Sequence, residues 1–238
     1  MIEKQLIDMK ENFIHVCFII DESGSMSGTE SDIIGGFKKI IDEQRAIKEG
    51  KCAVSLYKFQ SRVSKIYIGK DVNEVDYLDE KSYQPGGCTA MNDAIGTAID
   101  EIGKWLNDMD ESERPEKNLI VIMTDGEENS SVEYSFDKVK DMIKHQEEKY
   151  SWSFMYLGTD ITDASYAKSY GFDNRLYSSK KSIHKSYDMI NTSLNCYRTT
   201  TGSTEFKNDV FAINLASSID ALNEDYEKEI GKKITNND

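Results

Sequence analysis

The chain has 238 residues, and 43 acidic against 29 basic side chains give it a formal net charge of −14 at pH 7. A surface that binds nucleic acid is normally basic, so we expect no nucleic-acid partner. The length suits one α/β domain with a small appendage and excludes two full enzymatic domains. The four cysteines show no C-x-x-C pair, and no apolar stretch reaches the roughly 20 residues of a membrane span. We therefore expect a cytoplasmic protein without a membrane partner.

The first predicted strand is the apolar run over residues 13–20, which ends abruptly in Asp21-Glu22-Ser23-Gly24-Ser25. If this run is a buried parallel strand, the residues after it lie at its carboxyl end, the edge where open α/β sheets bind ligands. One carboxylate followed at alternate positions by two hydroxyls suits Mg²⁺, which takes oxygen ligands and is usually held by few carboxylates. The loop therefore predicts a site for a hard divalent cation.

Hydrophobic periodicity predicts that strands and helices alternate along most of the chain. The alternation indicates an α/β fold with a doubly wound, mainly parallel, Rossmann-like sheet and helices on both faces. Two adjacent short strands favour one antiparallel edge strand. The predicted strands are residues 13–20, 53–59, 63–68, 119–123, 152–157 and 175–178, and the predicted helices are those between Thr29 and Gly50 and over residues 91–107, 135–149, 163–170, 183–197 and 215–230.

Oxygen ligands recur in two further loops that the alternation places at the same edge of the sheet. Thr89 lies in Gly86-Gly87-Cys88-Thr89-Ala90-Met91-Asn92-Asp93, just before a long predicted helix. Asp125 follows the unbroken aliphatic run 119–123, which is typical of a strand covered on both faces. Five side chains thus form one candidate site: Asp21, Ser23, Ser25, Thr89 and Asp125.

This ordered set resembles the von Willebrand factor type A (VWA) domain and its metal-ion-dependent adhesion site (MIDAS). The resemblance covers roughly residues 10–199 and leaves residues 200–238 as a helical C-terminal extension. It implies that Ser23, Ser25 and Thr89 coordinate Mg²⁺ or Mn²⁺ through their hydroxyls. It also implies that Asp21 and Asp125 act largely through water or by hydrogen-bonding the serines.

The same resemblance implies a Mg²⁺-dependent protein-binding module of an intracellular bacterial or phage type, acting as an accessory or regulatory subunit. A cation held mainly by neutral hydroxyls attracts a carboxylate, so an acidic side chain of the protein partner would complete the coordination. Glu22, Glu127 and Glu128 are expected around the site, where their charge disfavours such a partner unless they point away. Asp93 is expected in the first turn of its helix, where the helix dipole favours a carboxylate.

Each of these motifs also has a purely structural interpretation. Aspartate, serine and glycine favour turns and caps, so the loop after the first strand could be ordinary turn chemistry. Thr89 taken alone fits the N-cap of the helix that follows it, and one hydroxyl can serve both purposes. Asp125 in Thr-Asp-Gly also fits a turn.

The competing functional class is a Mg²⁺-dependent phosphoryl-transfer hydrolase of the haloacid dehalogenase-like type, which also places an aspartate after its first strand. That chemistry resembles D-x-D, and Ser23 stands where the second aspartate would be. Residues 24–28 superficially resemble a G-x-S-x-G elbow, but their central residue is Met26. We therefore expect that the protein is not an enzyme.

The C-terminal part is predicted to be helical. Apolar residues at steps of three and four form one stripe over residues 183–197 and a second over 215–230, separated by a polar break at 199–204. The second stripe needs a surface to cover it. We expect this helix either to fold back on the domain or to serve as a docking or dimer helix.

Overall fold

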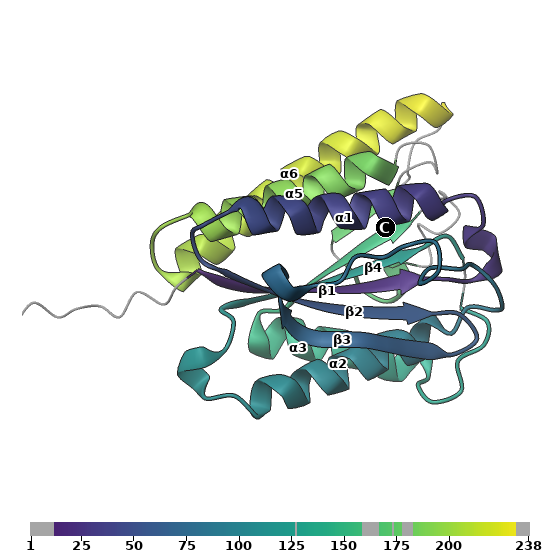
Figure 1. Cartoon of the computed structure of the whole chain (residues 1–238), viewed down its shortest axis with the longest axis horizontal. Coiled ribbons are helices and arrows are strands. Elements are labelled where there is room, and N and C mark those ends of the chain that lie inside the picture. The colour runs from purple at the N-terminus through teal and green to yellow at the C-terminus, as the bar shows by residue number, and fades with distance from the viewer. Residues whose placement is uncertain (1–11, 127, 159–166, 173, 178–182, 232–238) are drawn as a thin grey trace, which may run out of the picture.

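The computed structural model describes residues 12–126, 128–158, 167–172, 174–177 and 183–231. One six-stranded sheet in the order β3-β2-β1-β4-β5-β6 forms its centre, with β3 antiparallel and every other pairing parallel. Helices α1, α5 and α6 cover one face, and α2 and α3 cover the other (Figure 1). The predicted fold class is confirmed. The strands are β1 Phe13–Asp21, β2 Lys51–Phe59, β3 Val63–Asp71, β4 Lys117–Thr124, β5 Ser153–Gly158 and β6 Asn174–Tyr177, and the helices are α1 Glu30–Ala46, α2 Met91–Asn107, α3 Phe136–Tyr150, α5 Ile183–Thr199 and α6 Thr204–Ile230.

The central strands β1 and β4 are buried on both faces. In β1, Phe18 and Ile20 pack in the core under α1 and α5, whereas Cys17 and Ile19 pack in the core over α2 and α3. This explains why both strands have unbroken apolar sequences. The chain winds in opposite directions from β1 and β4, so the crevice between their carboxyl ends is the topological switch point where such sheets bind ligands.

The C-terminal helices form a hairpin that folds back on the domain (Figure 1). Phe211, Leu215 and Ile219 of α6 are buried in the same core as the sheet. The side chain of Asn223 donates to the Arg175 carbonyl at 3.0 Å and accepts from the Tyr177 backbone N–H at 3.0 Å. These bonds satisfy part of the free edge of β6, which a sheet must otherwise protect from pairing with another chain.

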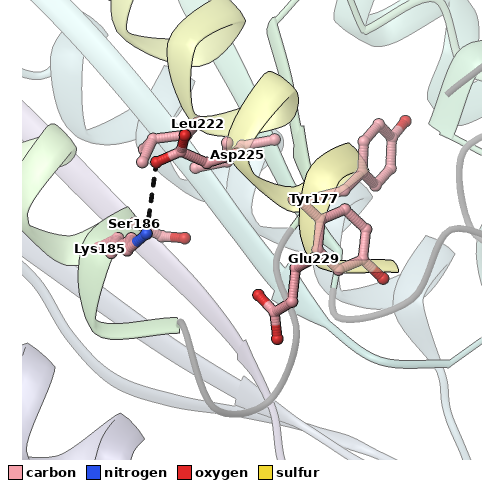
Figure 2. Close-up of a pocket in the computed structure, with 8 residues that line it drawn as sticks. Tyr177, Lys185, Ser186, Leu222, Asp225 and Glu229 are labelled. Atoms are coloured by element: carbon pink, nitrogen blue, oxygen red, sulfur yellow. Dashed lines mark hydrogen bonds and ion pairs between the residues drawn. The ribbon is translucent and has the colours of Figure 1, made fainter. Parts of the chain in front are cut away.

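The fit of this hairpin against β6 is close. Figure 2 shows the pocket that remains beside Tyr177, where Lys185 of α5 reaches Asp225 of α6 at 3.4 Å. Its volume of about 10 Å³ is close to the lower limit for a single water molecule. The pocket is therefore too small for a ligand, and the apolar stripe of α6 already has its cover within the chain.

The predicted start of the last helix is wrong, because α6 begins at Thr204 and not at residue 215. Ser203 caps it by accepting the Phe206 backbone N–H. The buried stripe runs back through Phe211 to Lys207, and a lysine in that position hid the apolar periodicity. Half of the predicted helix over 163–170 lies outside the described residues, and residues 167–169 of the described half are helical. Within the described part of the chain, no helix is both long enough and apolar enough to cross a membrane.

A buried histidine lies in the middle of the sheet. His15 is fully buried, with Nδ1 3.0 Å from Asn118 Oδ1 and Nε2 2.8 Å from Ser55 Oγ. The Ser55 hydroxyl also accepts the Gly69 backbone N–H at 2.9 Å, which leaves its own proton for His15. This network suits a neutral imidazole, and burial lowers the pKa of His15 to about 4, although the bond to Asn118 opposes the shift.

The low pKa of His15 should make folding stability sensitive to acid. Between about pH 6.5 and pH 4, His15 is protonated in the unfolded chain but stays neutral in the folded chain. The free energy of unfolding therefore falls as the pH falls. Denaturant unfolding of the wild type and of His15→Gln at pH 7 and pH 5 should show their stability difference shrinking by about 2 kcal/mol at the lower pH. A difference that does not change with pH would mean that His15 titrates normally in the folded protein.

Candidate metal centre

The site is built on the carboxyl ends of β1 and β4. Asp21 is the last residue of β1 and is fully buried. Its Oδ1 accepts the Ser23 backbone N–H at 2.7 Å, and its Oδ2 accepts the Thr124 hydroxyl at 2.6 Å. The Tyr83 hydroxyl donates to the Asp21 backbone carbonyl at 2.7 Å. The carboxylate of Asp21 is therefore held in one orientation and joins the ends of the two central strands.

The two aspartates of the site influence each other electrostatically. Burial raises the pKa of Asp21 to about 6, the hydrogen bonds from Thr124 and Ser23 oppose that rise, and the negative charge of Asp125 adds to it. The Oδ1 atom of Asp125 is itself buried. Two carboxylates that repel each other in a poorly solvated place favour a bound cation, because a nearby positive charge offsets both burial and repulsion.

Three hydroxyls from two loops come together next to these aspartates. Ser23 Oγ and Ser25 Oγ are 3.0 Å apart. A Cβ placed on Gly126 would lie 3.4 Å from Ser25 Oγ and 3.5 Å from Thr89 Oγ1, so the hydroxyls of Ser25 and Thr89 converge beside this glycine. Ser23 and Thr89 are buried, whereas Ser25 is exposed, so the cluster opens to solvent on the Ser25 side.

The capping interpretation of these hydroxyls is wrong. The N-cap of α2 is Ala90, without a side-chain bond, so Thr89 does not cap that helix. Ser23 stands at the N-cap of a short 3-10 turn, η1 (Gly24–Met26), but its side chain makes no capping bond. The hydroxyls of Ser23 and Thr89 therefore do not cap the helices that follow them.

Backbone hydrogen bonds fasten the first loop to the second. The Gly24 N–H donates to the Gly87 carbonyl at 3.2 Å, and the Gly86 N–H donates to the Glu22 carbonyl at 2.8 Å. Gly87 has φ of +76°, and a Cβ there would lie 2.4 Å from Gln60 Oε1. The sharp turn that carries the chain to Thr89 therefore requires glycine at this position.

The third loop is fastened to the second by a reciprocal pair. The Thr89 N–H donates to Asn129 Oδ1 at 2.9 Å, and the Asn129 N–H donates to the Thr89 carbonyl at 3.0 Å. Asp93 accepts the backbone N–H groups of residues 132, 133 and 134 at 2.9, 2.9 and 2.8 Å. Sequence reasoning placed Asp93 in the first turn of α2, where it lies, but missed that its carboxylate organises this loop.

The acidic residues expected around the site do not crowd it. Glu22 is buried and pairs with Lys58 at 2.8 and 3.0 Å. Glu128 accepts the backbone N–H groups of Asn92, Ser130 and Ser131 at 2.7 to 2.8 Å. Glu127 lies outside the described residues. Two of the three glutamates therefore turn to internal partners and oppose an acidic ligand less than the sequence suggested.

The donor set is made of oxygen alone, with three hydroxyls and two carboxylates. Such a set suits Mg²⁺ or Mn²⁺ better than a soft metal. Within the described residues, no group of three His, Cys, Asp or Glu side chains is placed to hold a metal. A cation at this edge would therefore depend on the hydroxyls of Ser23, Ser25 and Thr89.

Comparison with solved structures gives the same fold. The vWF domain of the type V pili tip protein Mfa5 from Porphyromonas gingivalis is 10% identical, with a TM-score of 0.59 over 81% of this chain and 98% of that one. Proximal thread matrix protein 1 from the mussel byssus, with a zinc-occupied MIDAS motif, is 16% identical, with a TM-score of 0.51 over 78% and 47%. A von Willebrand factor type A structure from Catenulispora acidiphila is 13% identical, with a TM-score of 0.50 over 79% and 49%.

The chain thus spans about half the length of the mussel and Catenulispora structures. At these identities the likeness concerns the fold alone. It gives no support to the haloacid dehalogenase alternative. A search of curated proteins found no match. The model of the von Willebrand factor type A domain matches residues 15–160, more than half of the sequence. The chain therefore belongs to the von Willebrand factor type A domain family.

Proposed function

We propose that this chain is a non-enzymatic, Mg²⁺-dependent or Mn²⁺-dependent module that binds a protein partner through a complete MIDAS. Its metal residues would be Asp21, Ser23, Ser25, Thr89 and Asp125. The observation that carries the proposal is the convergence of the Ser25 and Thr89 hydroxyls beside Gly126, which directly follows Asp125 in the chain. The zinc-occupied MIDAS of the mussel protein supports a divalent metal at this place in the family.

In this proposal the residues divide into ligands and supports. Ser23, Ser25 and Thr89 would bind the cation directly. The Asp21 carboxylate would hold the loop in place by accepting the Ser23 backbone N–H. A cation held by neutral hydroxyls keeps enough charge to attract a carboxylate from a partner. The exposed side of Ser25 provides the direction of approach. The inward bonds of Glu22 and Glu128 support an acidic partner group, because they remove two like charges from its path.

The wider setting is part of the proposal. Ser23 stands in place of the second aspartate of a phosphoryl-transfer site, which supports a binding role as an accessory or regulatory subunit rather than catalysis. We place that role in the cytoplasm of a bacterium or in a phage system. A dimer through the C-terminal helix stays a prediction. It was based on an apolar stripe that needs a covering surface, and the burial of Phe211, Leu215 and Ile219 within the chain weakens that argument.

A thermal titration tests the metal site. At a hundredfold excess over Kd, MgCl₂ or MnCl₂ should stabilise the folded wild type by roughly 2.7 kcal/mol and raise its Tm by about 5–10 °C. Ser25→Ala and Asp125→Asn should respond much less, because each removes an oxygen or a charge on which the cation depends. Differential scanning fluorimetry with the metal varied at fixed ionic strength gives the measurement.

Ser27→Ala is the matched control, since Ser27 lies in the same loop but its exposed hydroxyl bonds to the Gly24 carbonyl at 2.9 Å. It should respond like the wild type. Equal metal responses in the wild type and in Ser25→Ala would remove the site. Phosphatase and nucleotide-hydrolysis assays on the metal-loaded protein test the non-enzymatic part directly, and activity that Asp21→Asn abolishes would contradict it.

A further inference from the structure

A groove runs beside the candidate metal site, between α1 and the segment that leads to Pro85. Its volume is about 760 Å³, and its walls are partly apolar. Tyr83 is buried in it with its hydroxyl fixed on the Asp21 carbonyl. The described residues that line the groove are Glu30, Ser31, Ile34, Gly35, Glu80, Tyr83, Gln84 and Pro85.

The groove and the metal site share one loop. Glu30 accepts the Gly28 backbone N–H at 2.8 Å, directly after the Ser23 to Ser27 turn. On the opposite wall, the Gln84 backbone N–H donates to the Glu22 side chain at 2.6 Å. Both walls are therefore bonded to the loop that presents Ser23 and Ser25. The groove and the metal site are thus joined through this loop, and a partner segment bound at the metal would extend toward the groove.

The charge of the groove has one sign. Among the described residues that line it, two are acidic and none is basic. Glu80 is exposed and forms no ion pair within the described chain, and the hydrogen bond to Glu30 comes from the neutral Gly28 N–H. To an acidic partner segment that extends from the metal site into the groove, these two carboxylates would be like charges. A basic side chain in that segment would turn this repulsion into attraction.

The walls suit such a side chain. Ile34, Gly35 and Pro85 offer apolar surface along which the aliphatic stem of lysine or arginine can lie while its charged end reaches a carboxylate. We infer that the groove binds a lysine or arginine of the partner segment whose neighbouring aspartate or glutamate completes the metal coordination. The inference rests on the proposed function and adds to it the second half of the recognition pattern.

Peptide display on the whole 238-residue chain tests the inference. A random 12-residue library is selected in MnCl₂ and eluted with EDTA, first on the wild type and then on the double variant Glu30→Gln/Glu80→Gln. Peptides from the wild type should pair an acidic residue with a nearby lysine or arginine. Peptides from the double variant should keep the acidic residue and lose the basic excess.

Affinity measurements on one selected peptide make the test quantitative. Replacing its basic residue by glutamine should weaken binding to the wild type by about five-fold, and it should have little effect with the double variant. The matched control, Glu111→Gln/Glu113→Gln, removes the same charge before β4 begins, at the opposite edge of the sheet, and should behave like the wild type.

The outcomes separate the two proposals. Acidic peptides without a basic excess, or an equal loss of affinity in the wild type and in Glu30→Gln/Glu80→Gln, would overturn the groove inference and leave the metal-dependent module intact. Chelator-released peptides that Ser25→Ala binds equally well would overturn the metal site itself. A selection that yields no chelator-released peptide would overturn both.

Discussion

Lys207→Met should lower the free energy of unfolding by about 3–5 kcal/mol. The Lys207 ammonium pairs with the Glu116 carboxylate, and the two side chains are only 3% and 1% exposed. Lys207 also donates to Asn12 Oδ1 at 2.9 Å. Methionine keeps the apolar stem but leaves Glu116 as an uncompensated buried charge. Urea denaturation followed by circular dichroism measures the loss, with the m-value as a check that the folded state is still compact.

Two further variants identify the cause. Lys207→Met/Glu116→Leu removes both charges and should regain most of the lost stability, because the pair itself gains little over an apolar replacement. Lys228→Met lies on the same helix in an exposed ion pair with Asp225 and should change stability little. If the double variant is as unstable as Lys207→Met, the loss of stability comes from lost packing of α6 and not from the unpaired charge of Glu116.

Asp93→Ala should cost about 2–4 kcal/mol and also reduce the response to metal. The carboxylate of Asp93 accepts three consecutive backbone N–H groups, those of residues 132–134. With alanine at this position, these groups would have only water as a hydrogen-bond partner. The same loop carries Asn129, which pairs with the backbone of Thr89. Loosening the loop should therefore disturb a residue of the site that Asp93 does not touch. Denaturant unfolding and the Tm shift with MgCl₂ measure the two effects separately.

Asp100→Ala is the matched control for this prediction. Asp100 lies two turns further along α2, and among the described residues its side chain accepts one hydrogen bond, from the exposed Tyr134 hydroxyl at 2.7 Å. Its removal should cost much less stability and leave the metal-induced Tm shift unchanged. If Asp93→Ala keeps the full metal response despite its lower stability, the loop over 128–134 does not position the site.

The elements that the sequence predicts well are those with a single strong period. The run 119–123 is apolar at every position because β4 is covered on both faces, and α2 spans Met91–Asn107 as its apolar face indicates. The start of α6 was missed because a buried lysine, Lys207, interrupts the stripe. Its partner Glu116 is 91 residues away in the sequence, and no local pattern reveals such a pair.

The candidate site also has a part that the sequence predicts and a part that it does not. The loops that carry Asp21 and Asp125 were predictable, since they follow β1 and β4, and the carboxyl ends of neighbouring parallel strands meet at one edge. Thr89 follows no parallel strand, and its place in the site was predicted from the family resemblance. The residues that hold these loops were not predictable, because Asp93 and Glu128 bond to backbone groups. Every residue except proline offers the same backbone N–H group, so the sequence carries no signal for the partner of such a carboxylate.

Anomalous diffraction from a crystal soaked in MnCl₂ tests the central claim most directly. We expect one strong manganese peak beside Gly126, with the hydroxyl oxygens of Ser23, Ser25 and Thr89 about 2.1 Å away. The same soak of Ser25→Ala should weaken or remove the peak. A wild-type crystal with no manganese at this place, or with the Thr89 hydroxyl turned away from the peak, would contradict the account.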